Sequence, residues 1–152
     1  MIKIMFVCHG NICRSPMAEF IMKKLVRDAG LESEFEISSC AVSYEEAGND
    51  IYPPAKDELR RRGVPFSSRR AVRAQKQDYD EYDLFVVMDS SNLRNLTRIF
   101  EGDDEGKIHK LLEYTGQMRD VTDPWYSGNF DVAFDDIYAG CRALLENFAK
   151  TT

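Results

Sequence analysis

The sequence predicts a single-domain α/β fold in which a four-stranded parallel sheet lies between two layers of helices. Short runs rich in Val, Ile and Phe alternate with segments of helical pattern, which is typical of a parallel sheet covered on both faces. These runs are apolar at consecutive positions, as in strands buried on both faces. The 152 residues suit one domain, and no linker or repeat divides them, so we expect a single domain, 1–152.

The first strand is predicted at residues 2–8, where an apolar run ends at Cys8. After a short loop, Ser15 is a favourable N-cap and Pro16 suits the first turn of a helix, because its missing N–H would be unpaired there anyway. Gly30 is expected to end this helix as its C-cap.

The middle of the chain continues the alternation. Pro53 and Pro54 favour the opening of a helix and Gly63 its end. The expected elements are a strand at 35–42, a turn-rich loop at 43–55, a helix at 55–63, an irregular basic segment at 64–75 and a helical turn at 77–82.

The last third holds two strands, two helices and a long loop. The expected elements are a strand at 83–89, a helix at 90–100, an acidic loop at 101–106, a short strand within 107–114, a loop at 115–130 and a closing helix at 131–150. The apolar residues of the closing helix follow a period of 3.6. Long loops such as 115–130 are often functional in a compact domain.

Composition excludes several classes of protein. A net charge of -6 argues against a nucleic-acid binder, and no apolar run approaches the ~20 residues of a membrane span. No signal peptide is recognisable at the N-terminus. The cysteines, at positions 8, 13, 40 and 141, lack metal-binding spacing, so we expect no metal and reduced thiols in the cytoplasm.

The loop between the first strand and the first helix has the properties of an anion site. A helix N-terminus presents unpaired N–H groups, and Arg14 adds a guanidinium that matches phosphate oxygens. Cys8 faces the same positive field, which favours a thiolate that can attack phosphorus. The alternative is that Cys8 only ends a core strand and Arg14 is a surface charge.

Two motifs resemble those of the low-molecular-weight protein tyrosine phosphatases, and the resemblance covers essentially the whole chain. The signature loop Cys-x-Gly-Asn-x-Cys-Arg-Ser-Pro matches at Cys8, Gly10, Asn11, Cys13, Arg14, Ser15 and Pro16. The second motif is Asp123-Pro124-Trp125-Tyr126, and residues 86–96 resemble the family's central strand and helix. The resemblance implies a flavodoxin-like strand order 2-1-3-4 and no cofactor.

The resemblance also implies the chemistry, which is hydrolysis of phosphotyrosine in proteins through a phosphocysteine. Cys8 is the expected nucleophile and Arg14 the phosphate clamp. Such a reaction needs an acid for the leaving oxygen, and the resemblance assigns this role to Asp123. Without the resemblance Asp123 is an ordinary turn residue, and Asp120 is its nearby competitor. The expected phosphate-binding residues are His9, Gly10, Asn11, Ile12, Cys13 and Arg14.

Further residues are expected to support or wall the site. Ser15 could donate to the Cys8 sulfur, Asn11 could adopt a left-handed conformation with Ser39 as its partner, and Asp89 could hold the loop or Arg14. Each also suits a plain structural role, such as a helix cap or a turn. The expected pocket walls are Trp125, Tyr126 and Tyr44, although the family often has tyrosine at position 125 and large aromatic residues usually pack in cores.

Other expectations concern redox chemistry and the basic segment. By resemblance, Cys13 forms a reversible disulfide that shields Cys8, which makes Cys8 redox-sensitive; the alternative is simple packing. His9 is expected at the pocket rim. Arg69 and Arg70 stand where the family usually has a histidine, which weakens the expected hydrogen-bond network. The arginines between 60 and 73 form either a solvated face or a surface for acidic phosphopeptides.

Three rival functions are compatible with parts of the sequence. A protein-arginine phosphatase of the same scaffold carries threonine where Ile12 stands, and an arsenate reductase needs two more cysteines within 77–100, which contains none. A binding module without catalysis is disfavoured by intact Cys8, Arg14 and Asp123. The expected partners are phosphotyrosine proteins or peptides, a tyrosine kinase among them, with phosphate and vanadate as inhibitory oxyanions.

Overall fold

Four parallel strands form one sheet in the computed structural model, which describes residues 1–149. The strands are β1 (Ile2–Cys8), β2 (Phe35–Ala41), β3 (Leu84–Val87) and β4 (Ile108–Lys110). Their order is β2-β1-β3-β4, so the expected fold class and strand order are confirmed. In the register of the sheet, Ile4 of β1 lies opposite Ile37 on one side and Leu84 on the other.

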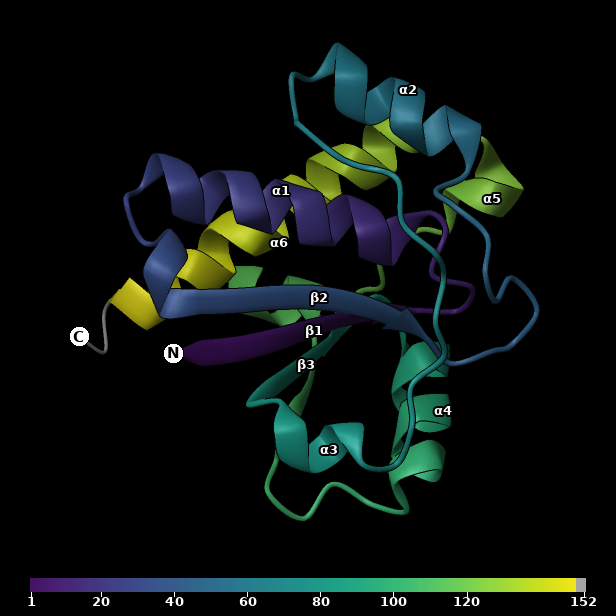
Figure 1. Ribbon diagram of the computed structural model, residues 1–152, viewed down its shortest axis with the longest axis vertical. Helices are drawn as coiled ribbons and strands as arrows, with labels where there is room; N and C mark the ends of the chain where they lie inside the picture. Colours follow the sequence, from purple (N-terminus) through teal and green to yellow (C-terminus); the bar gives the residue numbers. More distant parts are fainter. Residues whose placement is uncertain (150–152) are drawn as a thin grey trace.

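Helices cover both faces of this sheet (Figure 1). One face carries α1 (Arg14–Asp28) and α6 (Phe130–Ala149), with α2 (Pro53–Arg61) outside them. The other face carries α3 (Asp78–Glu81) and α4 (Ser90–Phe100). The remaining helices are short: the 3₁₀ turns η1 (Glu32–Glu34) and η2 (Leu111–Thr115), and α5 (Pro124–Ser127).

Alternate residues of β1 belong to different cores. Ile4 and Phe6 pack into the cluster with α1 and α6, whereas Met5 and Val7 pack with residues of α4. All four are almost fully buried. Each such side chain contributes about 1.5–3 kcal/mol of burial free energy, which explains why the strand is apolar at consecutive positions.

Two local expectations are wrong. The first helix begins at Arg14 with Cys13 in the cap position, so Ser15 is not the N-cap. The reason is that both the N–H and the hydroxyl of Ser15 face the Cys8 sulfur. The expected loop 115–130 contains α5, which Pro124 begins and which ends at Gly128 in a left-handed conformation. Position 150 of the predicted closing helix lies outside the described residues.

The topology creates a crevice at the carboxyl ends of β1 and β3. The chain leaves β1 toward α1 on one face and leaves β3 toward α4 on the other, so the loops after these neighbouring strands diverge. Cys8 ends β1 and Asp89 follows β3 at this edge. Within residues 1–149, no helix is long and apolar enough to cross a membrane.

Candidate active site

Cys8 lies at the end of β1 with only 3% of its surface exposed. Its Sγ accepts a hydrogen bond from the Ser15 N–H at 3.3 Å and lies 3.0 Å from Ser15 Oγ. Asn11 Nδ2 donates to the same hydroxyl oxygen at 2.8 Å, so the hydroxyl proton can go to the sulfur or to the Cys40 carbonyl, which is 3.4 Å from the hydroxyl oxygen. Two donors can therefore stabilise negative charge on the Cys8 sulfur.

Asn11 fixes the loop from inside the protein. It has a φ of 60°, in the left-handed region that asparagine tolerates better than most residues, and its side chain is fully buried. Besides Ser15, its Nδ2 donates to Ser39 Oγ at 2.9 Å, and its Oδ1 accepts from the Val72 N–H at 3.2 Å. Ser39 is in turn oriented by donating to Glu19 at 2.6 Å.

Arg14 is buried beside three acceptors. Its Nη1 donates to Asp89 Oδ2 at 2.9 Å and to the Val121 carbonyl at 2.7 Å, and its Nη2 donates to Asp123 Oδ2 at 3.5 Å. Burial alone would lower the pKa of Arg14, but the negative charges of Cys8, Asp123 and Asp89 raise it overall. Asp89 also caps α4 by accepting from the Asn92 N–H at 2.7 Å, so it has both of the roles considered for it.

The cavity above Cys8 has a volume, with its open mouth, of about 520 Å³. Asp123 lies on its wall, and its other carboxylate oxygen accepts from the Trp125 N–H at 3.0 Å, which caps α5. Trp125 and Tyr126 also line the cavity and are 49% and 85% exposed. They therefore do not pack in the core, which was the alternative for them.

Tyr44 does not line this cavity, so its expected place on the pocket wall is wrong. It is 61% exposed, and its ring lies 4.7 Å from the Arg73 guanidinium. This cation–π contact holds the Tyr44 ring beside Arg73. Its neighbours Glu45 and Glu46 line the cavity instead, and Glu45 lies 3.1 Å from Nε2 of His9, which is at the rim as expected.

Two residues that are not among the predicted site residues also support the site. Arg69 donates to the Asn11 carbonyl at 2.6 Å, so it supports the loop from the position where a histidine was expected. The Tyr52 ring packs against Trp125 in a tilted arrangement with 4.6 Å between ring centroids, and the Tyr52 N–H donates to the Ile12 carbonyl at 2.9 Å. Tyr52 carries no sequence signal beyond preceding Pro53.

Cys13 is a buried thiol that lines the same cavity as Cys8. Burial is the main cause that raises the pKa of Cys13, and the charges of Cys8 and Asp123 add to it. Cys13 is therefore a thiol beside the expected thiolate. Cys40 and Cys141 are buried in the core, where burial likewise raises the pKa of each thiol.

Chemically, the arrangement of Cys8, Arg14 and Asp123 around the cavity suits a nucleophile, an anion site and an acid. Apart from Tyr44, the structure brings the expected site residues together around the cavity or directly behind it. A tetrahedral dianion bound by the loop amides and Arg14 would lie between the Cys8 sulfur and the Asp123 carboxyl group.

The sequence and the fold are similar to those of known phosphatases. A family model described as low molecular weight phosphotyrosine protein phosphatase matches residues 3–152. The low molecular weight protein-tyrosine-phosphatase YfkJ of Bacillus subtilis is 36% identical over 152 residues, 99% of this chain and 97% of that protein. Its crystal structure has a TM-score of 0.96, with 36% identity and coverage of 100% of this chain and 97% of that one.

Two further relatives show how widely this likeness extends. A low molecular weight phosphotyrosine protein phosphatase of Schizosaccharomyces pombe is 36% identical over 153 residues, covering 99% of this chain and 96% of that protein. The crystal structure of a drosophila arginine phosphatase is 28% identical with a TM-score of 0.88, covering 97% of this chain and 98% of that one.

Proposed function

The chain belongs to the family of low-molecular-weight phosphotyrosine protein phosphatases and is a hydrolase of that kind, and on that premise we propose that it dephosphorylates phosphotyrosine in proteins through a phosphocysteine. The observation that supports this most is the placement of Cys8 beneath one cavity with Arg14 and Asp123 on its wall. We place this activity in the cytoplasm, where the four unpaired cysteines would stay reduced.

In the first step, the Cys8 thiolate attacks phosphorus and the bond to the phenolic oxygen breaks. Asp123 donates its proton to that oxygen, so tyrosine leaves neutral. The three remaining oxygens are held by loop N–H groups and by Arg14, whose pKa is raised, so it stays charged throughout.

In the second step, water attacks the phosphocysteine and Asp123 takes its proton. The sulfur–phosphorus bond breaks, and Cys8 leaves as a thiolate. Ser15 stabilises that thiolate through its N–H and hydroxyl, at 3.3 and 3.0 Å from the sulfur. Inorganic phosphate is the product, and phosphate and vanadate are expected to inhibit by occupying the loop.

Substrate choice follows from the cavity. Trp125 and Tyr126 line the cavity with exposed aromatic side chains that suit a phenyl group, and the burial of Cys8 favours a long side chain as its substrate. Ile12 lines the cavity with an apolar side chain, which has no hydroxyl to position an attack on phosphoarginine. Tyrosine is therefore favoured over arginine, even though an arginine phosphatase shares the fold.

The test is hydrolysis of an aryl phosphate without added metal and with a chelator present. We expect activity that vanadate inhibits and that Cys8→Ser abolishes. Cys141→Ala is the matched control, because it removes a buried thiol that donates to the Ala18 carbonyl, away from the cavity. Activity that survives Cys8→Ser would rule out the mechanism, and faster release of phosphate from phosphoarginine than from phosphotyrosine would reassign the substrate.

Cys13 is proposed to protect Cys8 from irreversible oxidation by forming a disulfide with it. Both thiols are buried and line the same cavity. After mild peroxide treatment, mass spectrometry should find a Cys8–Cys13 disulfide whose reduction restores activity. Sulfonic acid at Cys8 with no disulfide would count against this role.

A further inference from the structure

A second cavity lies behind the phosphate-binding loop, beside the free edge of β2. Segment 69–75 pairs with β2 through a single bridge between Ala41 and Arg73, and side chains from both line the cavity. Its volume, with its open mouth, is about 870 Å³. Three arginines line it: Arg69, Arg70 and Arg73.

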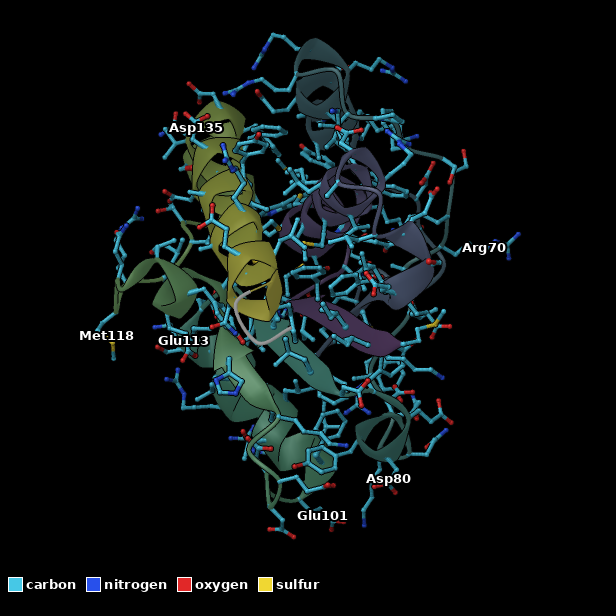
Figure 2. The ribbon with its side chains drawn as sticks, turned by 90° about the vertical axis from the view of Figure 1, so that its left-hand side faces the viewer. Arg70, Asp80, Glu101, Glu113, Met118 and Asp135 are labelled. Carbon is cyan, nitrogen blue, oxygen red and sulfur yellow. The ribbon has the colours of Figure 1, made fainter. Side chains whose placement is uncertain are left out.

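These three guanidinium groups have no ion pair with any carboxylate of residues 1–149. Arg70 extends away from the body of the protein at the mouth (Figure 2). Arg73 rests on the ring of Tyr44, donates to the Ala74 carbonyl at 3.1 Å, and keeps a buried Nε–H without an acceptor. Their acceptors are neutral oxygens, so an anion in the cavity would give these arginines the charged partner that they lack.

The acidic residues on the cavity walls are already engaged. Glu19 pairs with Lys23 at 2.6 Å and accepts from Ser39 at 2.6 Å. Asp78 accepts from the Gln75 N–H at 2.8 Å. The balance of charge facing the cavity is therefore positive, although the chain as a whole carries -6.

Two residues that line the cavity also hold Asn11 of the phosphate-binding loop. Arg69 lines it and donates to the Asn11 carbonyl at 2.6 Å. Ser39 lines it and accepts from Asn11 Nδ2 at 2.9 Å. An anion in the cavity would compete for the guanidinium that holds Asn11, and Asn11 in turn orients Ser15 beneath the Cys8 sulfur.

We propose that this cavity binds a small oxyanion of the phosphate class, and that occupancy slows turnover by drawing Arg69 away from the loop. The binding of the anion is independent of the proposed function. The effect of the anion on turnover rests on the proposed function, because turnover is measured as hydrolysis of an aryl phosphate.

The binding test is a titration of the whole chain with inorganic phosphate and with pyrophosphate, followed by backbone amide chemical shifts. Amides of 70–75 and Ser38 report the second cavity, and amides of 9–15 report the catalytic loop. Arg70→Gln and Arg73→Gln should each weaken binding at 70–75 by about tenfold, the loss expected for one charge-assisted contact. Arg142→Gln, on an exposed face of α6, removes the same charge and should change nothing.

The kinetic test measures phosphate inhibition at saturating aryl phosphate, which displaces phosphate from the catalytic loop. If phosphate still inhibits the wild type at saturating aryl phosphate but does not inhibit Arg70→Gln, the result supports coupling between the second cavity and turnover. Purely competitive inhibition would overturn the coupling. In the titration, chemical shift changes confined to residues 9–15 would overturn the site. Shift changes at 70–75 that are the same in Arg70→Gln and Arg73→Gln as in the wild type would also overturn it. If no aryl phosphate is hydrolysed, the proposed function fails, while the titration still decides the second site.

Discussion

At the scale of single residues, Arg14 balances the charges of the candidate site. It is 3% exposed, and it faces the carboxylates of Asp89 and Asp123 together with the Cys8 sulfur. Removing one partner of such a cluster leaves a buried charge uncompensated, which costs about 3–5 kcal/mol. Arg14 therefore holds the proposed catalytic groups in place before any substrate binds.

Asp123→Asn should slow hydrolysis selectively. The amide still accepts from the Trp125 N–H and so keeps the cap of α5, but it has no proton to donate to the leaving oxygen. We expect kcat to fall about 10²–10³-fold for phenyl phosphate, a poor leaving group, and far less for p-nitrophenyl phosphate. A series of aryl phosphates measures the dependence on leaving group.

Asp120→Asn is the matched control for this prediction. Asp120 pairs with Lys110 at 2.6 Å and accepts from the Ser90 N–H, so its carboxylate is committed outside the cavity. The same loss of kcat across all leaving groups in Asp123→Asn, or a steep dependence on leaving group in Asp120→Asn, would remove Asp123 from its role.

At the scale of elements, the contact of α6 with η2 depends on a glycine. Gly140 is buried in α6, and a Cβ there would clash with the Cγ of Leu111 and lie 2.8 Å from its Cδ1. Gly→Ala inside a helix normally stabilises by about 0.5–1 kcal/mol, but here overpacking should reverse the sign. We expect Gly140→Ala to lower the free energy of unfolding by about 1–3 kcal/mol, measured by urea denaturation.

A double-mutant cycle with Leu111→Ala isolates the cause. Leu111→Ala alone creates a cavity, but it also removes the atoms that the new methyl group meets. The double variant should therefore lose less stability than the sum of the two single variants. Additive losses would show that the clash is not what destabilises Gly140→Ala.

The elements were predictable where burial dictates the sequence pattern. The strands and the long helices follow apolar runs and periods, and the motif at Cys8 indicates the proposed phosphate-binding loop. α5 was missed because four residues are too short to show a period. The residue type of Ser15 favours a helix cap, whereas in the structure the sulfur of Cys8 competes for the same donors.

The parts of the site that escaped prediction depend on side-chain direction. Tyr44 lies close in sequence to Glu45, which lines the cavity, but it turns toward a guanidinium 29 residues away. Arg69 reaches the Asn11 carbonyl across 58 residues of chain. Such pairings follow from how segments meet in space, and a single sequence carries no signal of them.

At the scale of the whole molecule, Asp50 makes stability depend on pH. Hydrogen bonds, first from Lys56 at 2.7 Å and then from the backbone of Ile51 and Arg69, lower the pKa of Asp50 to about 2. Because the folded pKa lies below the unfolded value of about 3.9, its contribution is present above pH 4 and is lost as the pH falls toward 2. With partial exposure, we expect this contribution to be about 1 kcal/mol.

The measurement is urea denaturation at pH 5 and at pH 2.5. The wild type should lose more stability between these values than Asp50→Asn does. Asp57→Asn is the control, because Asp57 is an exposed carboxylate that pairs with Arg60 on α2. Equal losses for the wild type and Asp50→Asn would exclude Asp50 as a source of the acid sensitivity.

The bonds from Arg14 to Val121 and Asp123 also set an order of events during synthesis. Asp123 follows Arg14 by 109 residues, so the ribosome completes the cysteine loop long before it supplies the acid and the carbonyl that hold the guanidinium. Until then, Asp89 is the one carboxylate partner of Arg14 that the chain has supplied. The nascent protein therefore cannot hydrolyse a phosphoester by the proposed mechanism until its last third has emerged and docked beside β3, and a prematurely released fragment is inert.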